Sequence, residues 1–212
     1  MKIALVLLAV AAVCAAGGYR LLSNRPSQAT VALTAQLQDK VAIVYYSQSQ
    51  VQNTATLARW IQKYTSGKLI PLEMVQPYPE PYSATLKAAE QDFKSGGTPK
   101  LKSIPALESY DVVFLGTPIW YGTYAPPVGT FLKANELSGK TIVPFSTHGG
   151  GGAGRFVADL RRACPRALIL EDLSLRGSNQ IERRLKRGIS LRHTEDDVIN
   201  WLNRIFPAAK PE

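Results

Sequence analysis

The sequence predicts an α/β fold in which helices cover both faces of a five-stranded parallel sheet. Short, continuous apolar runs alternate along the chain with segments that carry a single apolar stripe. Continuous apolar runs are typical of strands buried on both faces, and strands that alternate with helices form parallel sheets. Right-handed crossovers then favour the doubly wound strand order 2-1-3-4-5.

Each expected strand is an apolar run bounded by polar or turn-forming residues. The expected strands span residues 41–46, 68–75, 112–115, 141–145 and 167–170. The expected helices carry apolar residues spaced three and four apart, as Leu57, Ile61 and Tyr64 are in the first of them. They span 54–64, 83–93, a segment from about 127, 155–162, and a last helix that Thr194 caps.

Residues 1–18 have the composition of an export signal. A positive start, Met1-Lys2, is followed by small apolar residues up to Gly18. This run is shorter than the roughly 20 residues of a spanning helix, so a cleaved signal peptide and an N-terminal membrane anchor both remain open. Residues 19–39 then predict a polar linker, and 40–207 the folded domain. We expect this domain to be exported, to the periplasm or the outer face of the inner membrane.

Charge and cysteine content restrict the function only weakly. The net charge of +9 would favour anionic partners, yet no nucleic-acid motif accompanies the basic residues. We therefore interpret them as a solvated surface and expect no nucleic-acid partner. The chain has two cysteines: Cys14 lies in the expected signal and Cys164 in the expected domain. A small buried hydrophobe is favoured over a redox thiol at Cys164.

Three loops of unusual composition follow the first, third and fourth expected strands. They are 47–54 (SQSQVQNT), 116–127 (GTPIWYGTYAPP) and 146–154 (STHGGGGAG). In a doubly wound sheet, ligands bind outside the carboxyl ends of the strands, where the strand order reverses. We therefore expect the three loops to converge on one ligand.

The first two loops suit an anion and a flat ring. Hydroxyl groups before a helix N-terminus favour phosphate, although an ordinary helix start capped by Asn53 or Thr54 has the same composition. Trp120 and Tyr121 are adjacent aromatic residues between glycines. They predict a stacking surface, with an aromatic plug at the sheet edge as the alternative.

The third loop is rich in glycine, which lets backbone lie against a ligand. His148 beside it either binds the ligand or only forms a turn. Gly149, Gly151 and Gly154 also match the G-x-G-x-x-G pattern of dinucleotide sites. That interpretation is disfavoured, because the pattern follows the fourth strand and chance matches are easy in such a run.

Two segments resemble the flavodoxin family, in particular its bacterial flavodoxin-like domains. They are 110–132 (YDVVFLGTPIWYGTYAPPVGTFL) and 137–165 (LSGKTIVPFSTHGGGGAGRFVADLRRACP), and 77–82 (PYPEPY) is also similar. The resemblance runs from about Val41 to Gly177. It implies a flavodoxin-like three-layer sandwich that binds FMN and takes part in redox chemistry.

The resemblance also implies which residues would hold FMN. The phosphate would be held by Ser47, Ser49, Asn53 and Thr54. The isoalloxazine would be lined on one side by Pro118, Ile119, Trp120, Tyr121 and Gly122, and at its other edge by Thr147, His148, Gly149, Gly150 and Gly152. The family's first loop carries a glycine before the Thr. Here Gln50 stands at that glycine and Val51-Gln52 resemble an insertion.

Two classes of function are therefore open. The first is an FMN-dependent redox protein, which is either an electron carrier or an NAD(P)H-dependent oxidoreductase. Its partner would be a redox protein or a small-molecule acceptor. The second, suggested by the altered first loop, is a flavin-free binding or accessory module. Because FMN itself performs the electron chemistry, no catalytic side chain is expected, and no His/Cys cluster has metal-ligand spacing.

Overall fold

The computed structural model describes residues 40–178, 189 and 193–207. The expected signal or anchor (1–18) and linker (19–39) lie outside these residues, as do the late basic residues Arg183, Arg184, Lys186, Arg187 and Arg192. Among the helices of the described residues, none is both long and apolar enough to cross a membrane.

A parallel sheet forms the centre of the domain, and its strand order confirms the prediction. The parallel strands are β1 (Val41–Tyr45), β2 (Lys68–Pro71), β3 (Val112–Trp120), β5 (Thr141–His148) and β6 (Leu168–Ile169). They lie in the order β2-β1-β3-β5-β6. With the short hairpin strand β4 left out of the count, this is the doubly wound order 2-1-3-4-5.

The fifth strand is divided in two, which the sequence pattern does not predict. β7 (Leu173–Arg176) resumes beside the second half of β5, where its last residue lies opposite His148. The Leu170 amide donates to the Ile142 carbonyl. In a parallel ladder, every second residue of β5 directs its N–H and C=O toward this neighbouring strand. After Ile142 the next such residue is Pro144, which has no N–H to donate. The ladder is therefore interrupted between β6 and β7.

The third and fourth strands are longer than predicted. β3 and β5 continue in register beyond the apolar runs, so that Pro118 lies opposite Thr147. β4 (Thr123–Tyr124) then folds back antiparallel to the end of β3. Thr117, Ser146 and Thr147 are buried in these extensions, and their polar side chains explain why the apolar pattern ends early.

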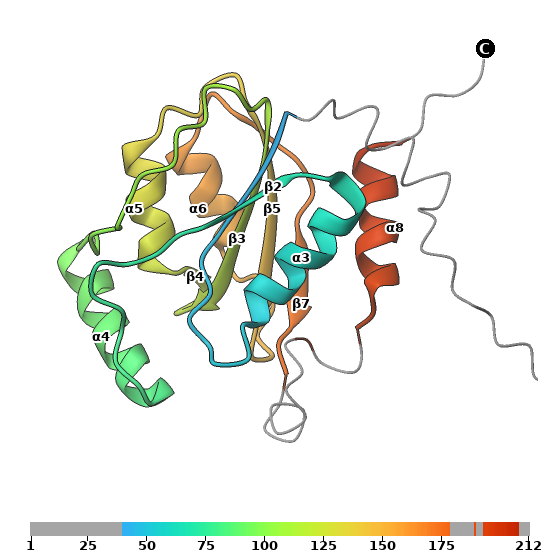
Figure 1. Ribbon diagram of the computed structural model, residues 1–212. Coiled ribbons are helices and arrows are strands. Elements are labelled where there is room, and N and C mark those ends of the chain that lie inside the picture. The colour runs from blue at the N-terminus through green and yellow to red at the C-terminus, as the bar shows by residue number, and fades with distance from the viewer. Residues whose placement is uncertain (1–39, 179–188, 190–192, 208–212) are drawn as a thin grey trace, which may run out of the picture.

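Helices cover both faces of the sheet (Figure 1). α3 (Asn53–Thr65) and α8 (Glu195–Ile205) lie on one face, and α5 (Pro126–Ala134) and α6 (Phe156–Ala163) lie on the other. α4 (Tyr82–Ser95) lies beside α5. The helix predictions at 54–64, 83–93, 127, 155–162 and 194 are therefore confirmed to within a few residues.

Alternate strand residues supply two apolar cores. Ile43, Phe114 and Phe145 pack with α3 and α8, whereas Val44, Leu115 and Ile142 pack with α5 and α6. Neighbouring residues on one strand thus face opposite layers, as strand geometry requires. This alternation continues to the strand ends, where it decides which side chains face which part of the cleft described below.

Two smaller predictions are also settled by the described residues. Thr194 caps α8: its hydroxyl accepts from the Asp196 amide, while the Asp197 carboxylate accepts from the Thr194 amide at 2.8 Å. Cys164 is buried at the end of α6, and burial raises the pKa of its thiol. This environment favours the small-hydrophobe interpretation over a redox thiol.

Candidate functional site

A cleft of about 630 Å³ opens at the carboxyl ends of β1, β3, β5 and β7. Its volume is typical of small-molecule sites. Each of the three predicted loops contributes to the lining. The predicted residues that line it are Ser47, Ser49, Asn53, Thr54, Pro118, Ile119, Trp120, Thr147, His148 and Gly149. Tyr121, Gly122, Gly150 and Gly152 do not line it.

The first loop reaches α3 through a residue in the left-handed conformation. Gln52 has φ 54° and ψ 50°, and its amide donates to the Ser49 carbonyl at 2.8 Å. A glycine-like conformation is therefore needed at Gln52, immediately before Asn53, and not at Gln50. Gln52, and not Gln50, therefore occupies the conformation that suits glycine, while the insertion at Val51-Gln52 stays a prediction.

The start of α3 is only partly capped by side chains. Gln52 is its N-cap residue but makes no side-chain capping bond, and the first turn contains no acidic residue. The Asn53 amide donates to Ser49 Oγ, so the Thr54 and Ala55 amides and the positive end of the helix dipole are available to an anion. Neither Asn53 nor Thr54 is the cap, so the alternative of an ordinary capped helix start is wrong.

The hydroxyl groups around the start of α3 differ in their hydrogen bonding. Ser49 Oγ accepts from the Asn53 amide at 3.1 Å. Thr54 Oγ1 and Thr147 Oγ1 lie 2.9 Å apart and join α3 to β5. Ser47 Oγ is buried without a partner, and it is the single such side-chain atom found in the part of the chain that the structure describes. An unpaired buried hydroxyl is costly, so this loop is incompletely satisfied without a ligand.

Aromatic side chains support the cleft from beneath. The Trp120 ring meets Tyr46 and Tyr78 edge to face, with centroids 5.9 Å and 5.6 Å away. The Tyr46 hydroxyl donates to Gln48 Oε1 at 2.6 Å, and Gln48 Nε2 donates to the Tyr78 carbonyl at 3.1 Å. Burial is the largest cause of the raised pKa of both tyrosines, so both remain protonated donors at neutral pH. Trp120 is only 4% exposed and forms part of the wall, not a free stacking platform.

Tyr121 and Gly122 form a turn directed away from the cleft. Their φ angles of 49° and 75°, between the paired residues Trp120 and Thr123, are those of a type I′ hairpin turn. The Tyr121 hydroxyl donates to the Leu86 carbonyl of α4 at 3.1 Å. The expected stacking of Tyr121 on a ligand in this cleft is therefore not what the structure shows, because the turn reverses the chain.

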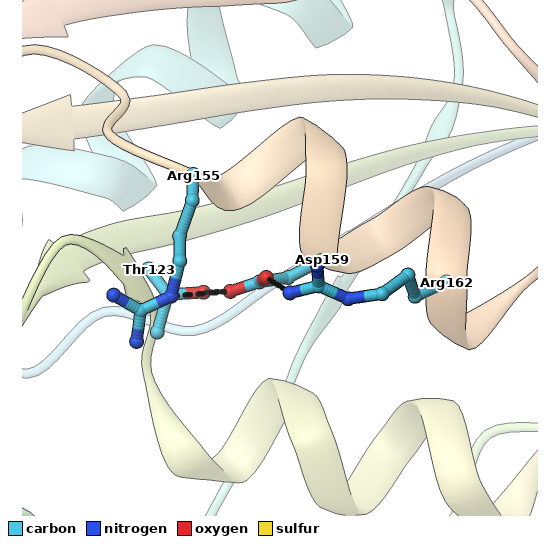
Figure 2. Close-up of polar contacts among 4 residues, drawn as sticks. All are labelled: Thr123, Arg155, Asp159 and Arg162. Carbon is cyan, nitrogen blue, oxygen red and sulfur yellow. Dashed lines mark hydrogen bonds and ion pairs between the residues drawn. The ribbon is translucent and has the colours of Figure 1, made fainter.

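The glycine-rich loop approaches the same turn. The Arg155 amide donates to the Gly122 carbonyl at 2.8 Å, and a Cβ on Gly154 would overlap that carbonyl. Asp159 of α6 adds bonds from Thr123 and Arg155 (Figure 2). Close packing against Gly122 accounts for Gly154, the third glycine of the dinucleotide-like pattern, without a dinucleotide.

His148 lies at the end of β5 with a defined proton position. Its Nδ1 accepts from the Gly150 amide at 3.0 Å, so the neutral ring carries its proton on Nε2. Burial, followed by the nearby charges of His193 and Arg176, lowers the pKa of His148. The ring is therefore neutral at pH 7 and can donate from Nε2.

Further lining residues are not among the predicted site residues. They are Gln48, Gln50, Val51, Glu80, Pro81, Thr85, Arg176, Gly177 and Ser178. The last three follow from β7, which has no clear signal in the sequence. Ser178 Oγ donates to Asn53 Oδ1 at 3.3 Å, and a Cβ on Gly177 would overlap Nδ2 of the Asn53 side chain. The end of β7 is thus packed against the start of α3.

The fold and the cleft define a class: a doubly wound α/β protein with a ligand-sized cleft where the strand order reverses. The family description "Flavodoxin" matches residues 40–205, and the chain belongs to the flavodoxin family. The predicted family and fold are thereby confirmed. A search of the curated proteins finds no match.

Solved structures of similar fold come from several bacteria. A candidate flavoprotein of Bacteroides eggerthii is 27% identical with a TM-score of 0.64, and the match covers 81% of this chain and 99% of that one. A candidate flavoprotein of Bacteroides uniformis is 22% identical, with a TM-score of 0.58 and coverage of 70% and 98%. A flavoprotein of Lactobacillus acidophilus, solved in complex with FMN, is 19% identical, with a TM-score of 0.56 and coverage of 68% and 97%.

Proposed function

We propose that the protein binds FMN in this cleft and exchanges electrons through it. The observation that carries the proposal is the meeting of a helix N-terminus whose N-cap side chain forms no capping bond, a buried unpaired hydroxyl and an apolar wall in one cleft. Membership of the flavodoxin family and the FMN complex of the similar Lactobacillus acidophilus protein support it.

The residues around the start of α3 suit the phosphate group. First-turn amides, the Ser47 hydroxyl and the Thr54–Thr147 hydroxyl pair are donors at the positive end of a 13-residue helix. The Ser49 hydroxyl accepts from the Asn53 amide and so shapes the loop, and its own O–H is still able to donate to the phosphate.

The opposite part of the cleft suits a flat, polar-edged ring. Pro118 and Ile119 supply apolar contacts, Gly149 supplies backbone without a side chain, and His148 supplies an Nε2 donor. When bound, FMN provides the electron chemistry itself. The side chains listed here bind, orient and shield it from water, and none is needed as a nucleophile.

Titration of the full-length apoprotein with FMN tests the proposal, with quenching of flavin fluorescence and the visible flavin bands as readouts. A matched pair of variants is Gly149→Val and Gly151→Val. A Cβ at either glycine meets open space, but only Gly149 lines the cleft. We expect Gly149→Val to weaken FMN binding at least about tenfold and Gly151→Val to change it less than about twofold.

A failure of the unaltered protein to bind FMN contradicts the proposal and favours the flavin-free accessory module. Equal effects of the two glycine variants would place the ligand elsewhere. If FMN binds, rapid reaction with NADH or NADPH identifies an oxidoreductase. Reduction only by a redox protein identifies an electron carrier.

We also propose that the domain functions outside the cytoplasm, on the strength of the apolar segment at 1–18. A carboxyl-terminal epitope tag and cell fractionation test this. Recovery in the periplasmic or membrane fraction supports export, and recovery in the cytoplasmic fraction contradicts it.

A further inference from the structure

Arg176 is a cation in the wall of the cleft that the phosphate proposal does not use. It is half-buried at the end of β7 and lines the cleft. Among the described residues it has neither a hydrogen-bonded nor an ion-paired side-chain partner. A half-buried guanidinium without a partner is unusual, because desolvation of a charge is offset only by bonding.

Strand alternation places Arg176 away from the expected phosphate. Thr147 bonds to Thr54 and therefore faces α3. His148, the next residue of β5, faces the other side of the sheet. Arg176 is opposite His148 in the parallel ladder and shares its face. The apolar Ile119 of β3 lies on that face too, since its neighbour Pro118 is opposite Thr147.

The other charged groups of the cleft do not neutralise this position. Glu80 also lines the cleft, two residues before α4, and has no bond to Arg176. His148 is neutral at pH 7. Arg176 is therefore the one permanent cation in the lining formed by the described residues.

We propose that Arg176 raises the reduction potential of the bound flavin by stabilising the negative charge gained on reduction. The inference rests on the proposed function. An external reductant such as dithionite supplies two electrons, and the solvent supplies one proton. The reduced flavin therefore carries one negative charge more than the oxidised flavin. A nearby cation favours that state over the neutral one.

The test compares the dissociation constants of oxidised and dithionite-reduced FMN for the full-length protein. The variants are Arg176→Gln, Arg176→Lys and, as the control, Arg161→Gln. Arg161→Gln changes the net charge of the protein by the same amount as Arg176→Gln. Arg161 is exposed on α6 and does not line the cleft, so it tests the effect of charge away from the flavin. We expect Arg176→Gln to weaken the binding of reduced FMN about tenfold more than the binding of oxidised FMN. This difference lowers the two-electron reduction potential of the bound flavin by about 30 mV.

Arg176→Lys keeps the charge and should retain most of the wild-type ratio, and Arg161→Gln should leave the ratio unchanged. Equal weakening of both redox states by Arg176→Gln assigns Arg176 to the phosphate or to the fold and overturns the inference, as does an unchanged ratio. If the unaltered protein binds no FMN, the proposed function fails first. FMN binding with an unaltered ratio removes only the role of Arg176.

Discussion

Asp159 of α6 ties the β3–β4 hairpin to the segment that leaves the glycine-rich loop (Figure 2). Its carboxylate accepts from the Thr123 hydroxyl and pairs with Arg155 Nε at 3.1 Å and with Arg162. Thr123 is 5% exposed, whereas the arginine side chains are 59% and 73% exposed. The hydroxyl contact is thus desolvated, whereas each ion pair joins an exposed guanidinium to a carboxylate whose side chain is 12% exposed.

Asp159→Ala is expected to lower the free energy of unfolding by about 2 kcal/mol. A buried hydroxyl left without its acceptor costs about 1–3 kcal/mol. Each ion pair contributes about 0–1 kcal/mol, because water and salt screen its exposed guanidinium end. Asp159→Asn keeps a carbonyl acceptor for Thr123, and its cost should therefore stay below about 1 kcal/mol.

Urea unfolding of the single variants, Thr123→Val and the double variant Asp159→Ala/Thr123→Val measures these energies. The double-mutant cycle should show a coupling of about 1 kcal/mol or more, because the two side chains are in direct contact. Should Asp159→Asn prove as destabilising as Asp159→Ala, the ion pairs would dominate and the reasoning would be wrong. Additivity of the two single changes would refute it as well.

Three further predictions concern the strand, the loop and pH. Gly116→Ala should cost about 2 kcal/mol in urea unfolding, because its Cβ would overlap the Phe145 ring; Phe145→Leu should recover part of this, and no cost would contradict the packing. Gln52→Gly should be neutral or stabilising by up to about 1 kcal/mol, since it relieves a left-handed residue; destabilisation beyond that would contradict the strain. The pKa of His148 lies below its ordinary value of 6.5, so the unfolded chain takes up its proton first as pH falls. Stability should therefore be unaffected by this group above about pH 7 and be lost as pH falls below 6.5, and His148→Gln should reduce that loss.

Most of the fold is predictable because its elements are local patterns. A continuous apolar run such as 41–46 indicates a strand covered on both faces, and the alternation of such runs with helix patterns identifies a parallel sheet. The spacing of Leu57 and Ile61 identifies a helix stripe in the same way. The division of the fifth strand is different, since it depends on which side of β5 the missing N–H of Pro144 faces.

The three cleft loops were predictable for a reason of topology, and their internal geometry was not. Parallel strands carry their following loops to one edge, so composition and topology together direct attention to 47–54, 116–127 and 146–154. The direction of Tyr121 depends on a two-residue turn with positive φ at both positions. A non-glycine residue in that conformation is uncommon, and nothing in the sequence identifies Tyr121 as the one that adopts it.

The extension of β3 and β5 beyond their apolar runs depends on contacts that the local sequence does not predict. Polar residues end the apolar runs, yet they remain in the sheet because each finds a hydrogen-bond partner. Thr117 accepts from the Ala125 amide, the Ser146 hydroxyl bonds to Ser174, and the Thr147 hydroxyl bonds to Thr54. Two of these partners lie far away in the sequence, so no local pattern predicts the pairing. Once the pairing exists, however, β5 continues through His148 and its alternation is forced. The division of the cleft into a side facing α3 and a side lined by Arg176 follows from those buried polar bonds, and replacing them would alter the site before it altered the fold.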